Sequence, residues 1–277
     1  MIRYKGWQRR FTEARGLRFS YLEWGKPVAL PIVFLHGITR HAHSWDPLSD
    51  AFKNDYHVLA LDQRGHGETQ WPDPPSYDTA DYVDDLAALT EAWGLDRFVL
   101  AGLSMGAHNG LAFAARHPDR VRDLVAVDIP PAVRRSAGAA PQSRPQVQPT
   151  VFNTFEAMLA AARQGQPRAP DNLLRHWIEA NARQTENGRW TFKHSPDATR
   201  NWRPADLWEE IPMIRCPTLV VRGGESNVLS PEVAEREVAA IPGARLVTIA
   251  GSGHNVPLDR APELVAAIRE LLVSQPS

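Results

Sequence analysis

The strongest constraint on the fold is a regular alternation of short apolar runs with longer segments of helical period. Six runs are apolar over most of their length: "PIVFLHG" (31–37), "YHVLALD" (56–62), "FVLAGLS" (98–104), "VRDLVAVD" (121–128), "PTLVVRGG" (217–224) and "ARLVTIAG" (244–251). Such runs suit strands that are covered on both faces, as in a parallel sheet. Helical patterns separate several of them, at Thr79–Trp93, Met105–His117, Pro231–Ile241 and Pro262–Leu272. The alternation predicts an α/β fold, with a parallel sheet between two layers of helices.

The beginning of the chain has a different pattern. Arg9–Ala14 and Leu17–Trp24 each alternate polar and apolar residues, and Arg15-Gly16 lies between them. Strict alternation is typical of a strand that is buried on one face only. The two segments therefore predict an antiparallel hairpin with its turn at Arg15-Gly16.

Residues 130–214 interrupt the alternation. The segment opens on a proline-rich stretch and continues with helical patterns at Phe152–Arg163 and Asn172–Gln184. A structureless loop of this length is uncommon within a compact domain. We therefore predict a mostly helical insertion at 130–214, placed within one core domain that is formed by residues 1–129 and 215–277.

Charge and composition exclude several classes of protein. The formal net charge of -1 offers no basic face for a nucleic acid. The single cysteine, Cys216, cannot form an intrachain disulfide. No apolar run approaches the roughly 20 residues of a membrane span, and the N-terminal stretch has no apolar core of a secretion signal. We expect a cytoplasmic protein that acts on a small molecule, and the oligomeric state stays open.

Ser104 lies in "GLSMG" (102–106), where a predicted strand gives way to a predicted helix. The G-x-S-x-G pattern is weak alone, but a strand before it and a helix after it force a tight reversal of the chain. The two glycines remove side chains that would collide there. The hydroxyl then projects above the sheet, near the positive end of the helix. We predict that Ser104 is a nucleophile; the alternative is an incidental serine in a glycine-rich turn.

A serine hydroxyl needs a base to take its proton. His254, in "IAGSGHNVPLDRAPE", follows the last predicted strand on a glycine-rich loop. The carboxyl ends of parallel strands meet at one edge of the sheet, so His254 is expected on the same edge as Ser104. His36 also lies at such an edge, but within a His-Gly turn. The other histidines are interpreted as surface or packing residues.

An oxyanion formed at the serine would need preorganised N–H donors. Met105 follows Ser104 at the start of a predicted helix, and its amide can supply one donor. Ile38, directly after His36-Gly37 and the first parallel strand, can supply the other. The alternative for His36-Gly37 is a simple loop turn.

These segments together resemble the α/β-hydrolase fold over nearly the whole chain. The resemblance is carried by "LHG" (35–37), "LDQRGHGET" (61–69), "GLSMG" (102–106), "PTLVVRGGESNVLSPE" (217–232) and "GSGH" (251–254). It implies a mostly parallel eight-stranded sheet, a helical cap at 130–214 above the active site, and a Ser-acid-His triad in that chain order. It also implies that Asp62, Arg64, Gly65 and Gly67 form a structural turn without chemistry.

The acid of the triad departs from the common pattern of the family. An aspartate often lies after the strand "TLVVRGG", but this chain has Glu225 and Asn227 there. An amide cannot stabilise an imidazolium, and an Asp-to-Asn change in a trypsin-like protease costs about 10⁴ in kcat. Asp128 ends the strand after that of the serine and keeps the order Ser, Asp, His. We predict Asp128 as the acid, with Glu225 or Asn227 as the alternative position.

The leading hypothesis is a carboxylesterase-like serine hydrolase that needs neither a metal nor an organic cofactor. Ser104 attacks, His254 transfers the proton, Asp128 stabilises the imidazolium, and the amides of Ile38 and Met105 hold the oxyanion. The scaffold also hosts carbon–carbon bond hydrolases, lactonases and perhydrolases, and fold alone does not choose among them. A non-catalytic ligand-binding member is a further alternative.

Candidates for the substrate pocket are fewer and less specific. Trp177 and Trp202, both in the predicted cap, are able to line an apolar pocket, and His36 lies next to the predicted oxyanion loop. Aromatic residues more often form the core of the element that carries them. The two tryptophans are therefore also candidates for the small core of the cap itself.

Overall fold

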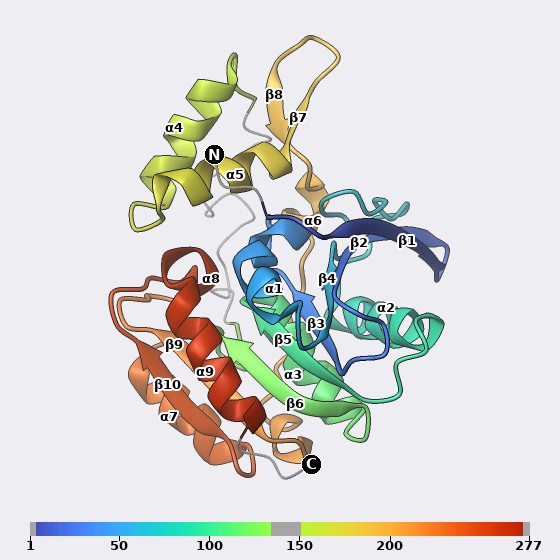
Figure 1. Cartoon of the computed structure of the whole chain (residues 1–277), viewed down its shortest axis with the longest axis vertical. Coiled ribbons are helices and arrows are strands. Elements are labelled where there is room, and N and C mark those ends of the chain that lie inside the picture. The colour runs from blue at the N-terminus through green and yellow to red at the C-terminus, as the bar shows by residue number, and fades with distance from the viewer. Residues whose placement is uncertain (1–3, 134–150, 274–277) are drawn as a thin grey trace.

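The computed structural model describes residues 4–133 and 151–273. Within them, a sheet of eight strands forms the centre of the molecule, in the order β1-β2-β4-β3-β5-β6-β9-β10 (Figure 1). The strands are β1 (Gln8–Ala14), β2 (Leu17–Trp24), β3 (Pro31–Leu35), β4 (His57–Leu61), β5 (Phe98–Leu103), β6 (Val121–Val127), β9 (Thr218–Gly223) and β10 (Arg245–Ile249). The β1–β2 and β2–β4 pairs are antiparallel, and the other pairs are parallel. The predicted hairpin and the mostly parallel eight-stranded sheet are confirmed.

Alternate residues of the central strands enter two different cores, because side chains on a strand point to opposite faces. On β3, for example, Ile32 and Phe34 enter one core, while Val33 and Leu35 enter the other. Both cores are covered by helices, which explains why these strands are apolar at successive positions.

Helices cover both faces of the sheet (Figure 1). On one face, α1 (Asp46–Phe52) and α9 (Ala261–Val273) pack on the strands. On the other, α2 (Thr79–Ala92) and α3 (Met105–Arg116) do so, and α7 (Pro231–Ala240) contacts β9 and β10. Short helices η1 (Ala42–Trp45) and α8 (Val256–Asp259) lie in loops. None of the helices in the described chain is long and apolar enough to cross a membrane.

The chain between β6 and β9 holds a separate group of small elements. They are α4 (Phe155–Gly165), α5 (Asp171–Asn181), β7 (Ala182–Gln184), β8 (Trp190–Phe192), α6 (Pro196–Arg200) and η3 (Ile211–Met213). Figure 1 shows α4, α5, β7 and β8 together at the top of the molecule, away from β9 and β10. Met158, Leu174 and Ile178 form a small core there. Residues 134–150 of the predicted insertion lie outside the described residues.

The predicted helix at Asn172–Gln184 was wrong in its last three residues. The helix α5 ends at Asn181, and β7 then pairs with β8 in an antiparallel ladder. Gly188, in the connecting turn, has a φ of 72°, which a glycine adopts without strain. The preceding Asn187 completes an Asn-Gly pair, a strong hairpin signal that outweighs helical periodicity here.

Candidate active site

Ser104 lies in a sharp turn between β5 and α3. Its backbone has φ 54° and ψ −120°. This combination is strained for any residue that carries a side chain. The flanking glycines allow this turn: a Cβ on Gly106 would lie 2.2 Å from the carbonyl oxygen of Leu35. A Cβ on Gly102 would likewise lie 2.4 Å from the carbonyl oxygen of Gly106. The Ser104 N–H donates to the carbonyl of Val127 at 2.9 Å, which fixes the turn to the neighbouring strand β6.

Asp128, the residue after β6, lies against the imidazole of His254. The distance from its Oδ2 to His254 Nδ1 is 2.7 Å. The carboxylate is fully buried, and it also accepts the Gly223 N–H at 2.9 Å and the hydroxyl of Ser226. Because an ionised carboxylate only accepts, Nδ1 carries the hydrogen and His254 Nε2 is the nitrogen that can take a proton. The geometry therefore pairs His254 with Asp128, from the strand next to that of Ser104.

The loop after β9 holds the two alternative positions for the acid, and neither faces the imidazole. Glu225 binds Arg168, which follows α4, and about half of its side chain is exposed. Asn227 is exposed, and its side chain makes no hydrogen bond within residues 4–133 and 151–273. Ser226, between them, is the residue of this loop that reaches Asp128. Sequence reasoning missed this role, because no motif marks the serine.

Glu237 on α7 is a further buried acid close to this pair. It is fully buried, and neither carboxylate oxygen has a hydrogen-bond partner in the described structure. Burial raises the pKa of Glu237 well above its ordinary value, and the nearby Asp128 carboxylate raises it further. Both effects favour the neutral form of Glu237 and oppose a second negative charge beside Asp128.

Two backbone amides are available beside the serine. Gly37 lies directly against it, since a Cβ on Gly37 would be 3.3 Å from Ser104 Cβ. The next residue, Ile38, donates its N–H to no acceptor among the described residues. Met105 is the first residue of α3, where an N–H has no partner within the helix. Both amides that the sequence suggested as oxyanion donors are thus unused by secondary structure.

Comparison with known proteins decides the family. A family model for the alpha/beta hydrolase fold matches residues 31–261. An esterase of Mycobacterium tuberculosis is 30% identical over 260 residues, which cover 91% of this chain and 86% of that protein. This chain belongs to the alpha/beta hydrolase family.

Further relatives of this hydrolase include an enzyme with a named substrate. The 2-(acetamidomethylene)succinate hydrolase of Mesorhizobium japonicum is 29% identical over 227 residues, or 81% of each chain. The crystal structure of an E-2-(acetamidomethylene)succinate hydrolase superposes with a TM-score of 0.88 at 26% identity. That superposition covers 97% of this chain and all of the other, so the shared fold includes the elements between β6 and β9.

His36 lies beside Gly37 and Ile38, in the loop that carries one of the two predicted oxyanion donors. It is fully buried; its Nδ1 lies 2.8 Å from the carbonyl oxygen of Gly37, and its Nε2 accepts the Gln63 N–H at 3.0 Å. Burial lowers the pKa of His36 to about 4, so the ring is neutral at pH 7. The ring has no exposed surface in this structure, and its predicted role in the pocket stays a prediction.

The two tryptophans of the predicted pocket are almost fully buried. Trp202 packs beside Met105 in a small apolar cluster. Trp177, on α5, donates its indole N–H to the Ser44 hydroxyl at 2.7 Å. The guanidinium of Arg40 lies over its ring, at 4.2 Å from the centroid. Trp177 thus joins α5 to the core, and the lining role of both tryptophans stays a prediction.

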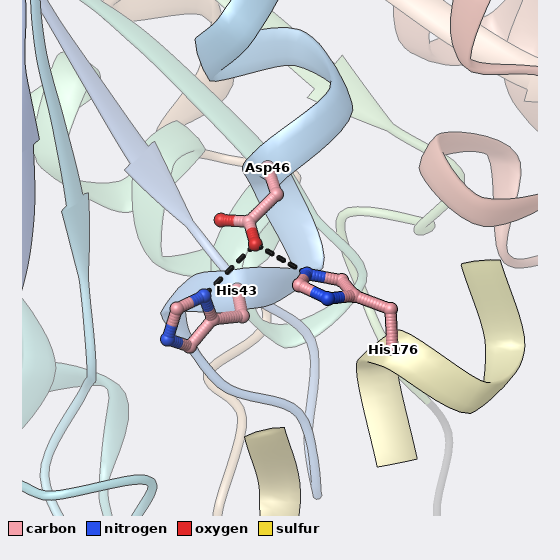
Figure 2. A group of neighbouring side chains, drawn as sticks. All are labelled: His43, Asp46 and His176. Carbon is pink, nitrogen blue, oxygen red and sulfur yellow. Dashed lines mark hydrogen bonds and ion pairs between the residues drawn. The ribbon is translucent and has the colours of Figure 1, made fainter. Parts of the chain in front are cut away.

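A cluster of three side chains also joins α5 to the core (Figure 2). Asp46 Oδ2 lies 2.9 Å from Nδ1 of His43 and 2.6 Å from Nε2 of His176. His176 is on α5, whereas His43 and Asp46 are on η1 and α1. In the described part of the chain, these three residues are the ones whose ligand atoms lie close enough together to hold a metal ion.

The hydrogen bonds of this cluster oppose metal binding. Arg9 donates to Nε2 of His43 at 3.1 Å, so that nitrogen accepts and the hydrogen resides on Nδ1. A metal on Nδ1 would need the opposite tautomer, and it would lie close to the Arg9 cation. Ligating histidines normally donate their other N–H to a carboxylate or carbonyl. We therefore interpret the cluster as a polar tie between α5 and the core.

Proposed function

We propose that this protein is a serine hydrolase that cleaves carboxylic esters of small molecules through an acyl-enzyme. The observation that carries the proposal is the 2.7 Å hydrogen bond between His254 and the buried Asp128, from the strand next to that of Ser104. The backbone of Ser104 is strained in the way that a nucleophile on a strand-to-helix turn requires. The esterase relative from Mycobacterium tuberculosis supports the same chemistry.

The proposed reaction has two halves. Ser104 Oγ attacks the ester carbonyl while His254 Nε2 takes its proton, and the negative oxygen accepts from the N–H groups of Ile38 and Met105. His254 then protonates the departing alcohol. In the second half, His254 removes a proton from water, which attacks the acyl group. The bond to Ser104 Oγ then breaks, His254 returns the proton to Oγ, and the acid is released. Asp128 holds the imidazole in the correct tautomer and stabilises its charged form in both halves.

The route needs neither a metal ion nor an organic cofactor, because every proton transfer uses His254. The substrate is a small acyl compound rather than a nucleic acid. A cytoplasmic location remains the expectation from the sequence.

Hydrolysis of 4-nitrophenyl acetate and 4-nitrophenyl butyrate tests the proposal. The wild type should release 4-nitrophenolate, and Ser104→Ala should lower kcat by at least about 10³-fold, because it removes the attacking atom. Ser49→Ala is a matched control: it deletes a buried hydroxyl on α1 that has no hydrogen-bond partner in the described structure. An unchanged rate in Ser104→Ala contradicts the proposal, and a wild type without turnover favours a non-catalytic binding protein.

A further inference from the structure

The guanidinium of Arg40, in the loop that follows β3, forms no ion pair with a carboxylate of the described residues. Its backbone N–H donates to the carbonyl of Gly37 at 3.0 Å, so the loop turns back on itself there. The side chain makes no ion pair and no hydrogen bond with any residue of 4–133 or 151–273. By contrast, the buried Arg64 binds Asp85 and the partly buried Arg9 binds Asp62.

Arg40 lies between the proposed nucleophile and α5. Its Cγ would be 3.6 Å from a Cβ placed on Gly37, and Ser104 Cβ would be 3.3 Å from the same point. At its other end, the guanidinium stacks on the Trp177 ring of α5 at 4.2 Å. The side chain therefore runs from the oxyanion loop to α5, so it borders the space where a substrate of Ser104 would lie.

The surroundings of Arg40 are unfavourable for an unpaired charge. Burial lowers the pKa of Arg40 to about 10, while the carboxylate of Asp259 acts in the opposite direction. Asp259 itself is bound to the N–H of Gly253 at 2.8 Å. The histidines that face Arg40, namely His36, His41 and His194, have pKa values lowered by burial and carry no charge at pH 7. Arg40 stays charged at pH 7, and none of the described carboxylates forms an ion pair with it to offset its desolvation.

We propose that Arg40 binds a carboxylate of the substrate, so that the preferred substrates are esters that carry a free carboxylate group. A guanidinium presents two parallel N–H donors that match the two oxygens of a carboxylate. The Trp177 ring beneath it holds the plane of the fork. This inference rests on the proposed hydrolysis at Ser104, and it adds a substrate class to it.

Two matched pairs of esters test the inference. In 4-nitrophenyl hydrogen succinate and 4-nitrophenyl butyrate, a carboxylate replaces a methyl group on the acyl side. In 4-acetoxybenzoate and 4-tolyl acetate, the same exchange is on the leaving group. The readout is the ratio of kcat/KM for the anionic ester to that for the neutral one. Arg40→Met should lower this ratio by about 10- to 100-fold in at least one pair, as expected for loss of a charged hydrogen bond.

Two further variants serve as controls: one keeps the charge at position 40, and the other removes a different arginine. Arg40→Lys keeps the charge without the fork and should restore part of the ratio. Arg175→Met removes an exposed arginine of α5 that pairs with Glu156, and the ratio should stay at the wild-type value. If both pairs of esters give the wild-type ratio in Arg40→Met and Arg40→Lys, the inference is wrong.

Calorimetry on the Ser104→Ala background distinguishes a failed inference from a failed hydrolase. The intact 4-nitrophenyl hydrogen succinate is titrated into Ser104→Ala and into Ser104→Ala with Arg40→Met. A Kd that rises by about 10- to 100-fold in the double variant supports carboxylate binding, even if the wild type turns over no ester. Equal Kd values in the two proteins overturn the role of Arg40 and leave the proposed hydrolysis to its own test.

Discussion

The carboxylate of Asp128 is held by its neighbours in a position where it contacts the imidazole of His254. Asp128 follows β6 with a φ of 54°, and its side chain reaches the end of the neighbouring strand β9. There the Gly223 N–H and the Ser226 hydroxyl fix the carboxylate, and the remaining direction is occupied by the imidazole of His254. The loop after β9 therefore supports the acid instead of supplying it.

Substitutions of Asp128 and Asn227 show which of the two positions supplies the acid that pairs with His254. Asp128→Asn should lower kcat for 4-nitrophenyl butyrate by about 10³- to 10⁴-fold, because an amide cannot stabilise the imidazolium. Asn227→Ala should change kcat by less than about threefold, because an exposed surface side chain is removed. Steady-state kinetics at pH 8 measures both. The reverse order of effects would place the partner of His254 in the loop after β9.

The sequence predicted the positions of some site residues but not of others. Ser104, Asp128 and His254 each follow a predicted strand, and the carboxyl ends of parallel strands share one edge of the sheet, so their sequence positions alone predict that they meet. Ser226 and Arg40 carry no such signal, because their contacts depend on how loops fold over that edge. His36 follows a strand too, but the direction of its ring, toward Gln63, is set by tertiary packing.

Among the elements, α5 is joined to the core by buried polar contacts. Asp46 accepts from His176, and the indole of Trp177 binds the Ser44 hydroxyl. A buried hydrogen bond is worth most where its loss leaves a polar group without a partner. Asp46 is fully buried, and without His176 its Oδ2 would keep only the bond from His43 (Figure 2).

Removal of this bond should loosen α5 locally. His176→Ala leaves Asp46 with one fewer donor, at a cost of about 1–3 kcal/mol to the docking of the helix. Hydrogen exchange of the α5 amides should accelerate by about 5- to 100-fold, while exchange in β3 and β5 stays at the wild-type rate. Arg175→Ala, an exposed change on the same helix, is the control. Equal exchange rates of the α5 amides in His176→Ala and the wild type would show that the His176–Asp46 bond does not hold α5 to the core.

The elements of the core were predicted to within one or two residues, because each has a strong period and a clear end. The short elements were not. The strands β7 and β8 have three residues each, too few for a period to emerge. The helix α1 was missed as well, since its segment is short and follows a run of polar residues.

At the scale of the whole molecule, buried neutral histidines gather around the site. Burial lowers the pKa of His36 and His108 to about 4 and that of His66 and His194 to about 3, and it takes that of His41 well below 6.5. Their rings serve as neutral packing and hydrogen-bonding groups in the folded state.

These histidines predict a loss of stability in weak acid. Between pH 6.5 and the lower folded pKa values, the unfolded chain binds more protons, so the free energy of unfolding falls as the pH falls. Each histidine contributes up to about 1.4 kcal/mol per pH unit. Burial raises the pKa of Glu237, Asp123 and Asp259, which act in the opposite direction but are fewer. Urea unfolding at pH 7.5, 6.0 and 5.0 should show a steep decline, and a constant free energy would contradict it.

The central claim is that Ser104 is an activated nucleophile with His254 as its base. The most direct measurement is mass spectrometry of the protein after reaction with a fluorophosphonate, which modifies activated serines. The account predicts one phosphonyl adduct, on the peptide that contains Ser104, and its loss in His254→Ala. An unmodified wild-type protein, or an adduct on another residue with Ser104 intact, would contradict the account.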